Sequence, residues 1–270
     1  MKRKLVTRGL GIAVCLFHIV PFFIMLNVAF KSRTDASSKW VTPTYLYLDN
    51  FVNAWKEAHL ARALLNNTII TTAAVACVIT LGALAAYPLA RFPTRWNNFV
   101  YTLSISVLIV PALTILVPLY KFIVDLGGIN TYWAITAVQV TFFLPLAIFM
   151  FTGFIKTIPR ELDEAALIDG CSRYAIFFRI ILPLLKPVTA SLIILVGLSV
   201  WNDFQFSLFF LQRRSVQTVP VLLSQFFSQY QNEVAWVAAG CLISMIPMAC
   251  VYLFLQKYFV SGLAEGAIKG

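Results

Sequence analysis

Long apolar segments alternate with short polar ones along the whole chain. The apolar segments run over residues 10–30, 67–90, 99–122, 133–155, 188–211 and 234–259. Each is close to the roughly 20 residues that a helix needs to cross the hydrocarbon core of a bilayer. Inside lipid the backbone groups must bond to one another within a segment. The pattern therefore predicts an all-α polytopic membrane protein with six transmembrane helices.

Composition agrees with a lipid-facing protein. Of the 270 residues, 60% are hydrophobic and only 12% are charged, which excludes an ordinary soluble domain. The net charge of +10 comes from Lys and Arg in short runs between the apolar segments. Such runs set membrane orientation, and they do not form the basic face that a nucleic-acid partner requires.

The distribution of basic residues predicts the orientation. With both termini in the cytoplasm, 13 of the 21 Lys and Arg residues face the cytoplasm and the other eight face outwards. Cytoplasmic loops carry an excess of such residues, so both termini are expected inside. The first apolar segment follows four basic residues, as a signal peptide does. It is long and has no small-residue cleavage site, so we expect it to remain as a helix.

Two polar segments are long enough to be more than connections. Residues 31–66 lie outside in this orientation and contain a helix-like stretch at 50–65. The other segment is cytoplasmic and joins the fourth and fifth spans. Within the second span, Gly82 and Ala86 follow the small-x-x-x-small spacing that allows two helices to approach closely.

The cytoplasmic segment begins with a predicted helix of about eleven residues, from Pro159 to Gly170. Proline fits a first helical turn, and Glu161 and Asp163 place negative charge near the positive end of the helix dipole. Gly170 suits the left-handed conformation that ends a helix. Leu162, Ala165, Ala166 and Asp169 recur at spacings of three or four. This gives a small-residue patch that fits a groove on a partner protein.

A second stretch, residues 174–185, is apolar and basic. Phe177, Phe178, Ile180 and Ile181 are placed to lie against the membrane or the helix bundle. Pro183 and Pro187 end this stretch and turn the chain into the fifth span.

The residues of this cytoplasmic segment resemble a motif of a known family. Glu164-Ala165-Ala166, then Gly170, then Ile180-Ile181-Leu182-Pro183 resembles the complete EAA loop of ABC importer permeases. In that family the loop is the coupling helix that docks on a separate ATPase subunit. An interfacial amphipathic helix is the alternative, but it does not demand these residues at these spacings. The resemblance implies the following ATPase-coupling residues: Glu164, Ala165, Ala166, Asp169, Gly170, Ile180, Leu182 and Pro183.

Other segments resemble the carbohydrate branch of the same family. They are residues 87–92, 117–120, 126–131 and 201–204, with a tail at 259–270 like that of the maltose-type six-span permeases. The resemblance implies a multi-pass subunit of a bacterial-type inner membrane that imports sugars or oligosaccharides. Its implied partners are a second permease, an ATPase dimer and an extracytoplasmic sugar-binding protein.

The resemblance also divides the chain. Residues 1–66 are expected to be an N-terminal helix and extracellular loop, and 67–260 the importer transmembrane domain with the EAA loop at 159–187. Residues 261–270 are expected to form a cytoplasmic tail. The sequence has no G-x-x-x-x-G-K-[ST] run, so ATP and Mg are expected on the partner and this chain is not an enzyme.

The expected substrate path is Trp201, Asn202, Asp203 and Phe204, at or just beyond the middle of the fifth span. An ionisable group at membrane depth is costly and usually faces a cavity or a partner. The same residues also suit a helix junction held by local hydrogen bonds. In the outer loop at 212–233, Gln217, Gln225, Gln229 and Gln231 either contact the binding protein or are ordinary solvated residues.

Other classes of membrane protein require residues of other kinds. An ion-coupled transporter needs titratable groups at membrane depth, and the apolar segments offer little besides Asp203 and His18. An intramembrane enzyme needs paired carboxylates or a His or Cys cluster, and the five cysteines are scattered without C-x-x-C spacing. No catalytic or metal-binding residue is predicted. A permease for a non-sugar solute stays open as an alternative.

Overall fold

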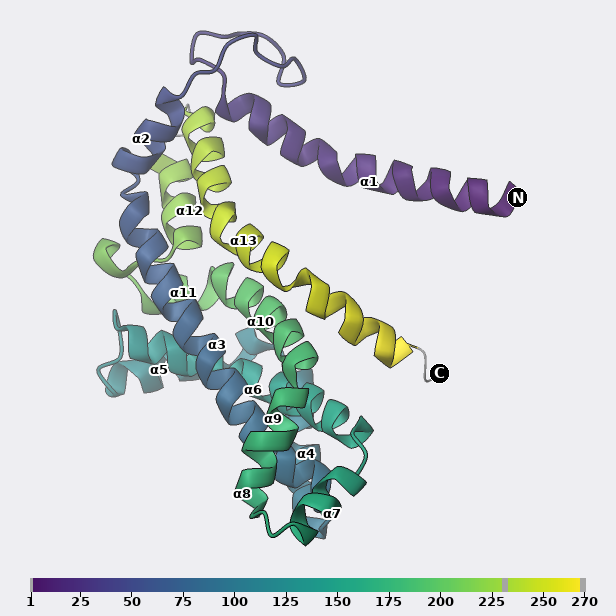
Figure 1. The fold of residues 1–270 in the computed structure, drawn as a ribbon. Helices are drawn as coiled ribbons and strands as arrows, with labels where there is room; N and C mark the ends of the chain where they lie inside the picture. Colours follow the sequence, from purple (N-terminus) through teal and green to yellow (C-terminus); the bar gives the residue numbers. More distant parts are fainter. Residues whose placement is uncertain (1, 230–232, 268–270) are drawn as a thin grey trace. The chain divides into compact units, whose positions relative to one another are not determined.

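The computed structural model describes residues 2–229 and 233–267, with side chains for 7–229 and 233–257. Within these ranges every regular element is helical (Figure 1). The chain forms two compact units. One contains Met1–Leu64 and Val219–Ile246, and the other contains Leu65–Thr218 and Pro247–Gly270.

Four helices are long and apolar enough to cross a membrane without a break. They lie within α1 (Lys2–Ala29), α3 (Leu60–Arg91), α6 (Tyr132–Thr157) and α13 (Val234–Ala267). Two further helix pairs are sharply bent. Arg95–Ile109 meets Ala112–Asp125 at 92°, and Arg173–Leu184 meets Lys186–Trp201 at 70°. The described chain thus has four to six candidate spans, the higher number if each bent pair is one span.

The third apolar segment is not the continuous helix expected over residues 99–122. The helix α4 (Arg95–Ser106) and the 3-10 turn η1 (Val107–Ile109) stop before Pro111, and η2 (Ala112–Ile115) and α5 (Leu116–Asp125) follow. Val110 is extended, with ψ of 120°. The reason is local, because proline lacks an N–H and forces the preceding residue out of the helical conformation.

The fifth segment also departs from expectation. The helix α10 (Lys186–Trp201) ends ten residues earlier than the predicted boundary at 211, and the short helix α11 (Gln205–Phe210) follows a break. Asn202 and Asp203 lie directly after the end of α10 and not within a continuous helix. Asn and Asp favour such ends because their side chains bond to nearby backbone.

The first unit combines α1, α2 (Asp49–Glu57), α12 (Val219–Gln229) and the first parts of α3 and α13. The helix-like stretch predicted at 50–65 is two helices, because His59 adopts a positive φ of 51° between α2 and α3. Ala29 and Ala54 pack with Ala238 and Ala239, and Leu60 packs with Phe226 in a second cluster.

The loop between α1 and α2 is held by polar contacts. Lys31 donates to the Ser37 hydroxyl at 2.6 Å, and the Tyr45 hydroxyl donates to Asp35 at 2.6 Å. Hydrogen bonds from Ser37 and Tyr45 lower the pKa of the Asp35 carboxyl to about 2. In the same unit Arg33 pairs with Glu233 at 2.7 Å.

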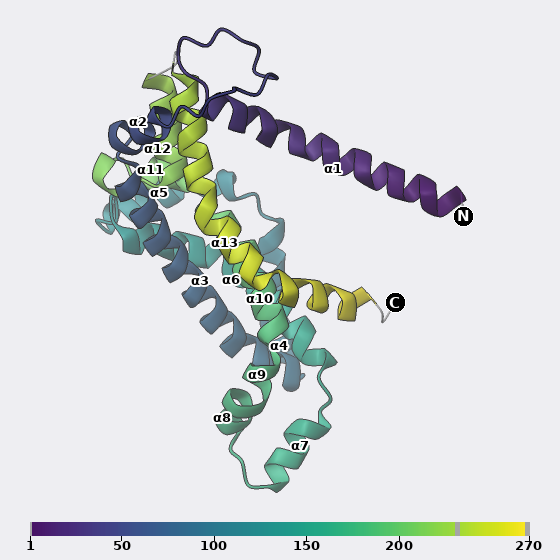
Figure 2. The same cartoon turned by 45° about the horizontal axis from the view of Figure 1, so that its top comes forward.

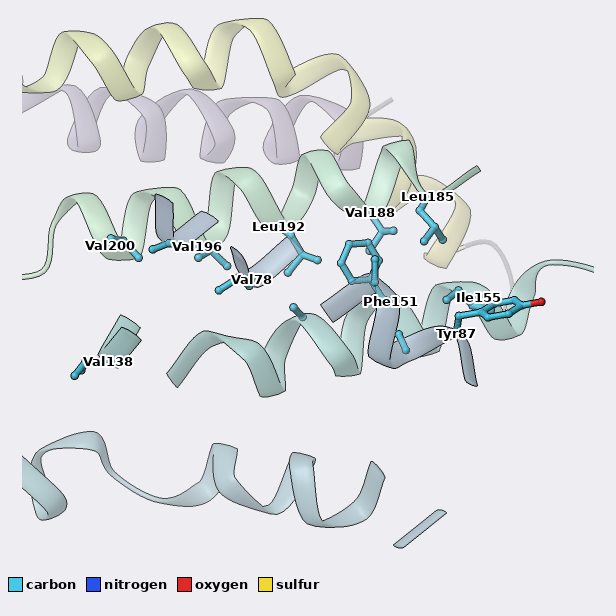
Figure 3. Close-up of a cluster of buried hydrophobic side chains, with 14 of the residues drawn as sticks. Val78, Tyr87, Val138, Phe151, Ile155, Leu185, Val188, Leu192, Val196 and Val200 are labelled. Atoms are coloured by element: carbon cyan, nitrogen blue, oxygen red, sulfur yellow. The ribbon is translucent and has the colours of Figure 1, made fainter. Parts of the chain in front are cut away.

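The second unit is built around α3, α6 and α10, whose buried apolar side chains form its core (Figure 3). Val78, Phe151, Leu192 and Val196 are fully buried there. A Cβ added at Gly82 would lie only 2.7 Å from the Cβ of Ala147 on α6. The close approach predicted for this glycine is therefore confirmed.

Candidate functional site

The segment predicted to lie in the cytoplasm forms the helix α7, which spans Glu161–Ile168. With α8 (Arg173–Ile176) it lies at one end of α3 (Figures 1 and 2). The helix has eight residues, so the expected length of about eleven is wrong. Ile158 is extended before Pro159, with ψ of 128°, and proline therefore precedes the first turn instead of forming it.

The end of α7 follows the sequence prediction. Gly170 has a φ of +81°. Its N–H donates to the Leu167 carbonyl at 3.0 Å, and the Cys171 N–H donates to the Ala166 carbonyl at 2.9 Å. This pair of bonds is the Schellman motif, which satisfies carbonyls that a helix end leaves free. A side chain at position 170 would meet nothing within 4 Å in this chain.

The two faces of α7 have different surroundings. Ala166 is only 6% exposed and packs into the core of the second unit, and Asp163 also faces inwards. Placing Ala166 on the exposed patch was therefore wrong, because residues 163 and 166 share the face one turn apart that meets the bundle. The outer face exposes the following side chains: Glu161, Leu162, Glu164, Ala165, Leu167 and Ile168.

An anchor that the sequence reading missed joins α7 to the end of α3. Arg91 pairs with Asp163 at 2.8 Å, with side chains 5% and 13% exposed. The Arg91 guanidinium also donates to the Ile158 carbonyl at 3.0 Å. The Tyr87 hydroxyl donates to Asp163 at 3.0 Å, and Figure 3 shows this hydroxyl pointing out of the apolar cluster. The only sign of this anchor in the sequence is that Tyr87 and Arg91 are four residues apart and therefore share one face of α3.

The chain from α7 to α10 is irregular. After α8, residues Phe177–Ile181 form a π-helix, and α9 covers Leu182–Leu184. Ile181 is buried, Ile180 and Leu182 are half-buried, and Pro183 is exposed. Pro187 lies in the first turn of α10, after the 70° bend. The turn into the fifth span predicted from the two prolines is present.

The residues expected to form the substrate path make a junction between α10 and α11. Asn202 donates to the Leu198 carbonyl at 2.8 Å. Asp203 accepts from the Ser207 N–H at 2.8 Å and the Ser207 hydroxyl at 2.7 Å, which caps α11. Trp201 is buried, whereas Asn202 and Phe204 are exposed. Local hydrogen bonds thus hold the junction, as the structural alternative required, and the side chains of Asn202 and Phe204 remain exposed.

The two groups of predicted residues are not brought together. In both views α7 and α11 lie at opposite ends of α3 (Figures 1 and 2). Of the glutamines in the outer loop, Gln217 is buried, Gln225 and Gln229 are exposed on α12, and Gln231 lies outside the described residues. The helix α13 continues to Ala267, so most of the expected tail at 261–270 is helical.

Known transport proteins are similar to this chain over nearly its whole length. The permease protein MelC of Bacillus subtilis (strain 168), named for melibiose, raffinose and stachyose import, is 44% identical over 99% of this chain and 97% of its own length. The trehalose/maltose permease protein MalG of Thermococcus litoralis is 33% identical over 100% of this chain and 98% of its own length.

Solved structures share the fold. A chain of a bacterial ABC transporter that imports the acidic polysaccharide alginate has a TM-score of 0.77 and 20% identity, covering 95% of this chain and 96% of that one. Residues 78–265 match the family described as the inner membrane component of binding-protein-dependent transport systems. This match spans α3 to α13, including α7 and the α10–α11 junction, and the chain belongs to that family of ABC transporter permeases.

Proposed function

We propose that this chain is a transmembrane permease subunit of an ATP-driven, binding-protein-dependent importer of oligosaccharides, and that α7 couples it to a separate ATPase. The observation that carries the coupling role is the two-sided environment of α7. Arg91 and Tyr87 fasten its inner face to α3. Its outer face leaves Glu164, Ala165 and Ile168 exposed, and Ile168 is 87% exposed.

Such a surface suits a protein groove. A short helix with small and apolar side chains beside carboxylates offers both close packing and charged hydrogen bonds. In this proposal Glu164, Ala165, Asp169 and Gly170 lie at the ATPase. Ala166, Ile180, Leu182 and Pro183 act from within the loop by fixing the direction of α7.

The energy source and partners follow from the same proposal. ATP and Mg bind the ATPase dimer, whose closure moves α7 and exposes the path to the outside by rigid-body movement. A second permease completes the path, and an extracytoplasmic binding protein delivers the sugar. The chain lies in a bacterial inner membrane with both termini in the cytoplasm.

The substrate class rests on the relatives. MelC is named for melibiose, raffinose and stachyose, and AraQ of Halalkalibacterium halodurans, 31% identical, is named for arabinooligosaccharides. We propose small oligosaccharides as the cargo, with Asn202, Asp203 and Phe204 beside the path. An amide, a carboxylate and an aromatic ring match the hydroxyls and the apolar faces of a sugar.

The test is mass spectrometry of the proteins that co-purify with the tagged chain in mild detergent, together with uptake of radiolabelled raffinose. Gly170→Asp is expected to abolish recovery of the ATPase and to reduce uptake strongly. Gly127→Asp is the matched control, because Gly127 also has a positive φ, of 65°, and open space around it. Both variants cost the same backbone strain, so only docking separates them.

The expected result is that the Gly127 variant keeps both the ATPase and uptake. Recovery of the unmodified chain without any ATPase would overturn the importer assignment. Loss of the ATPase in both variants would show that strain, and not the contact at Gly170, is responsible. Normal raffinose uptake after deletion of the gene would reject oligosaccharides of this type as the substrate.

A further inference from the structure

The helix α3 makes polar contacts at both of its ends within the second unit. At one end Asn67, only 1% exposed, donates its side-chain amide to the Trp201 carbonyl at 3.1 Å. Trp201 is the last residue of α10, where carbonyls lack partners inside the helix. At the other end Tyr87 and Arg91 hold Asp163 of α7.

The residue next to Asn67 strengthens the first contact. Asn66 donates to the Ser215 carbonyl at 3.1 Å and the Gln217 carbonyl at 2.9 Å, and it accepts from the Tyr132 hydroxyl at 2.7 Å. Ser215 and Gln217 both follow α11, and Tyr132 is the first residue of α6. The first turns of α3 are thus bonded to the end of α10 and to the segment that follows α11.

Between these contacts α3 is one continuous helix. Asn67 and Tyr87 are 20 residues apart, or about 30 Å at 1.5 Å per residue, which matches the thickness of a bilayer core. No proline interrupts this stretch, since Pro88 is the one proline inside α3. The close contact of Gly82 with Ala147 joins α3 to α6 along its length.

The stretch of chain that leads from α7 to the same junction is less regular than α3. It passes through the π-helix at Phe177–Ile181 and the 70° bend before α10. We expect a π-helical turn and a sharp bend to pass on a displacement less directly than one continuous helix does. A movement of α7 therefore reaches the junction more directly through α3.

We infer that Asn67 is a positioning residue: it links α3 to the Trp201 carbonyl, so that α3 carries the movement of α7 to the α10–α11 junction. Because Asp203 caps α11 through Ser207, a shift of the Trp201 carbonyl moves Asn202, Phe204 and α11 together. The substrate-facing side chains would then change position when the ATPase closes. This inference rests on the proposed function.

The test uses the complete importer, purified with its ATPase and second permease and reconstituted in liposomes. The variant is Asn67→Leu, which keeps the branching at Cγ and removes the donor. The control is Thr72→Val, an exposed polar position on the same helix. A reporter cysteine replaces Gln205, the exposed first residue of α11, after the five native cysteines are changed to serine.

The measurements are the labelling rate of the reporter with and without ADP trapped by vanadate on the ATPase, and the ATP hydrolysed per sugar imported. In the unmodified chain and in Thr72→Val the labelling rate should depend on nucleotide. In Asn67→Leu this dependence should disappear, and ATP hydrolysed per sugar should rise by up to about tenfold. That factor corresponds to about 1.4 kcal/mol, near the upper end of what one hydrogen bond contributes.

The outcomes separate the two proposals. If Asn67→Leu is not recovered in the membrane, Asn67→Ser serves instead, because serine bonds to its own helix and does not reach Trp201. Unchanged nucleotide dependence in a recovered Asn67 variant would overturn the role of Asn67 and assign the movement to residues 171–185. An unmodified chain without an ATPase would overturn the proposed function, and this inference with it.

Discussion

Asp163 and Glu164 are adjacent carboxylates with different surroundings. Asp163 faces the end of α3, where it pairs with Arg91 and accepts from Tyr87. Glu164 lies about 100° further round α7 and is exposed. The first residue therefore serves the stability of this chain, and we propose that the second serves the contact with the ATPase. A sequence motif that names only the second carboxylate misses the first.

Thermal unfolding of the purified chain in detergent separates the two roles. Asp163→Asn should lower the free energy of unfolding by about 3 kcal/mol, since removal of one partner leaves a buried charge unpaired. Glu164→Gln should change it by less than about 0.5 kcal/mol. In the assembled importer the affinity of folded chains for the ATPase should fall more in Glu164→Gln than in Asp163→Asn. Equal losses of stability in both variants would contradict the inward position of Asp163.

The helix pair α3 and α6 depends on the absence of a side chain at one position. Gly82 on α3 lets the two backbones approach. At Gly153 on α6, an added Cβ would have nothing within 4 Å. The same substitution at these two glycines therefore separates helix packing from helix propensity.

We expect opposite signs for the two alanine variants in the purified chain. Gly82→Ala should destabilise it by about 1–3 kcal/mol, because the helices must move apart. Gly153→Ala should stabilise it by up to about 1 kcal/mol, because alanine is the better helix former. The check is the midpoint of thermal unfolding followed by tryptophan fluorescence. Stabilisation by both substitutions would show that α3 and α6 do not need this contact.

At the scale of the whole molecule, orientation in the membrane is a property of charge and not of packing. From the excess of Lys and Arg on one set of loops we propose that α7 and both termini lie in the cytoplasm. The loop between α1 and α2, with the Asp35 and Tyr45 contacts, then lies outside.

Labelling from one side of the membrane tests this orientation. With the native cysteines replaced, Ala36→Cys should react with a membrane-impermeant maleimide in intact spheroplasts. Glu161→Cys should react only after the membrane is made permeable. The reverse pattern would place α7 outside and remove it from any cytoplasmic ATPase.

The sequence by itself determined the features that depend on neighbours along the chain. It predicted the apolar segments, the helix that became α7, and the left-handed end at Gly170. Periodicity, dipole charge and glycine φ act over a few residues, so they can be read without a fold. The family resemblance came from the same local spacings.

Only the tertiary structure decided which face of α7 is buried. It also supplied the two contacts that connect the functional elements, Arg91 with Asp163 and Asn67 with Trp201. The second joins residues 134 positions apart in the chain. No local pattern encodes such a pairing, because a buried polar group finds its partner only after the helices pack. Pro111 and Asn202 stand at the two helix breaks, but the apolar residues around them gave both segments the pattern of a continuous span.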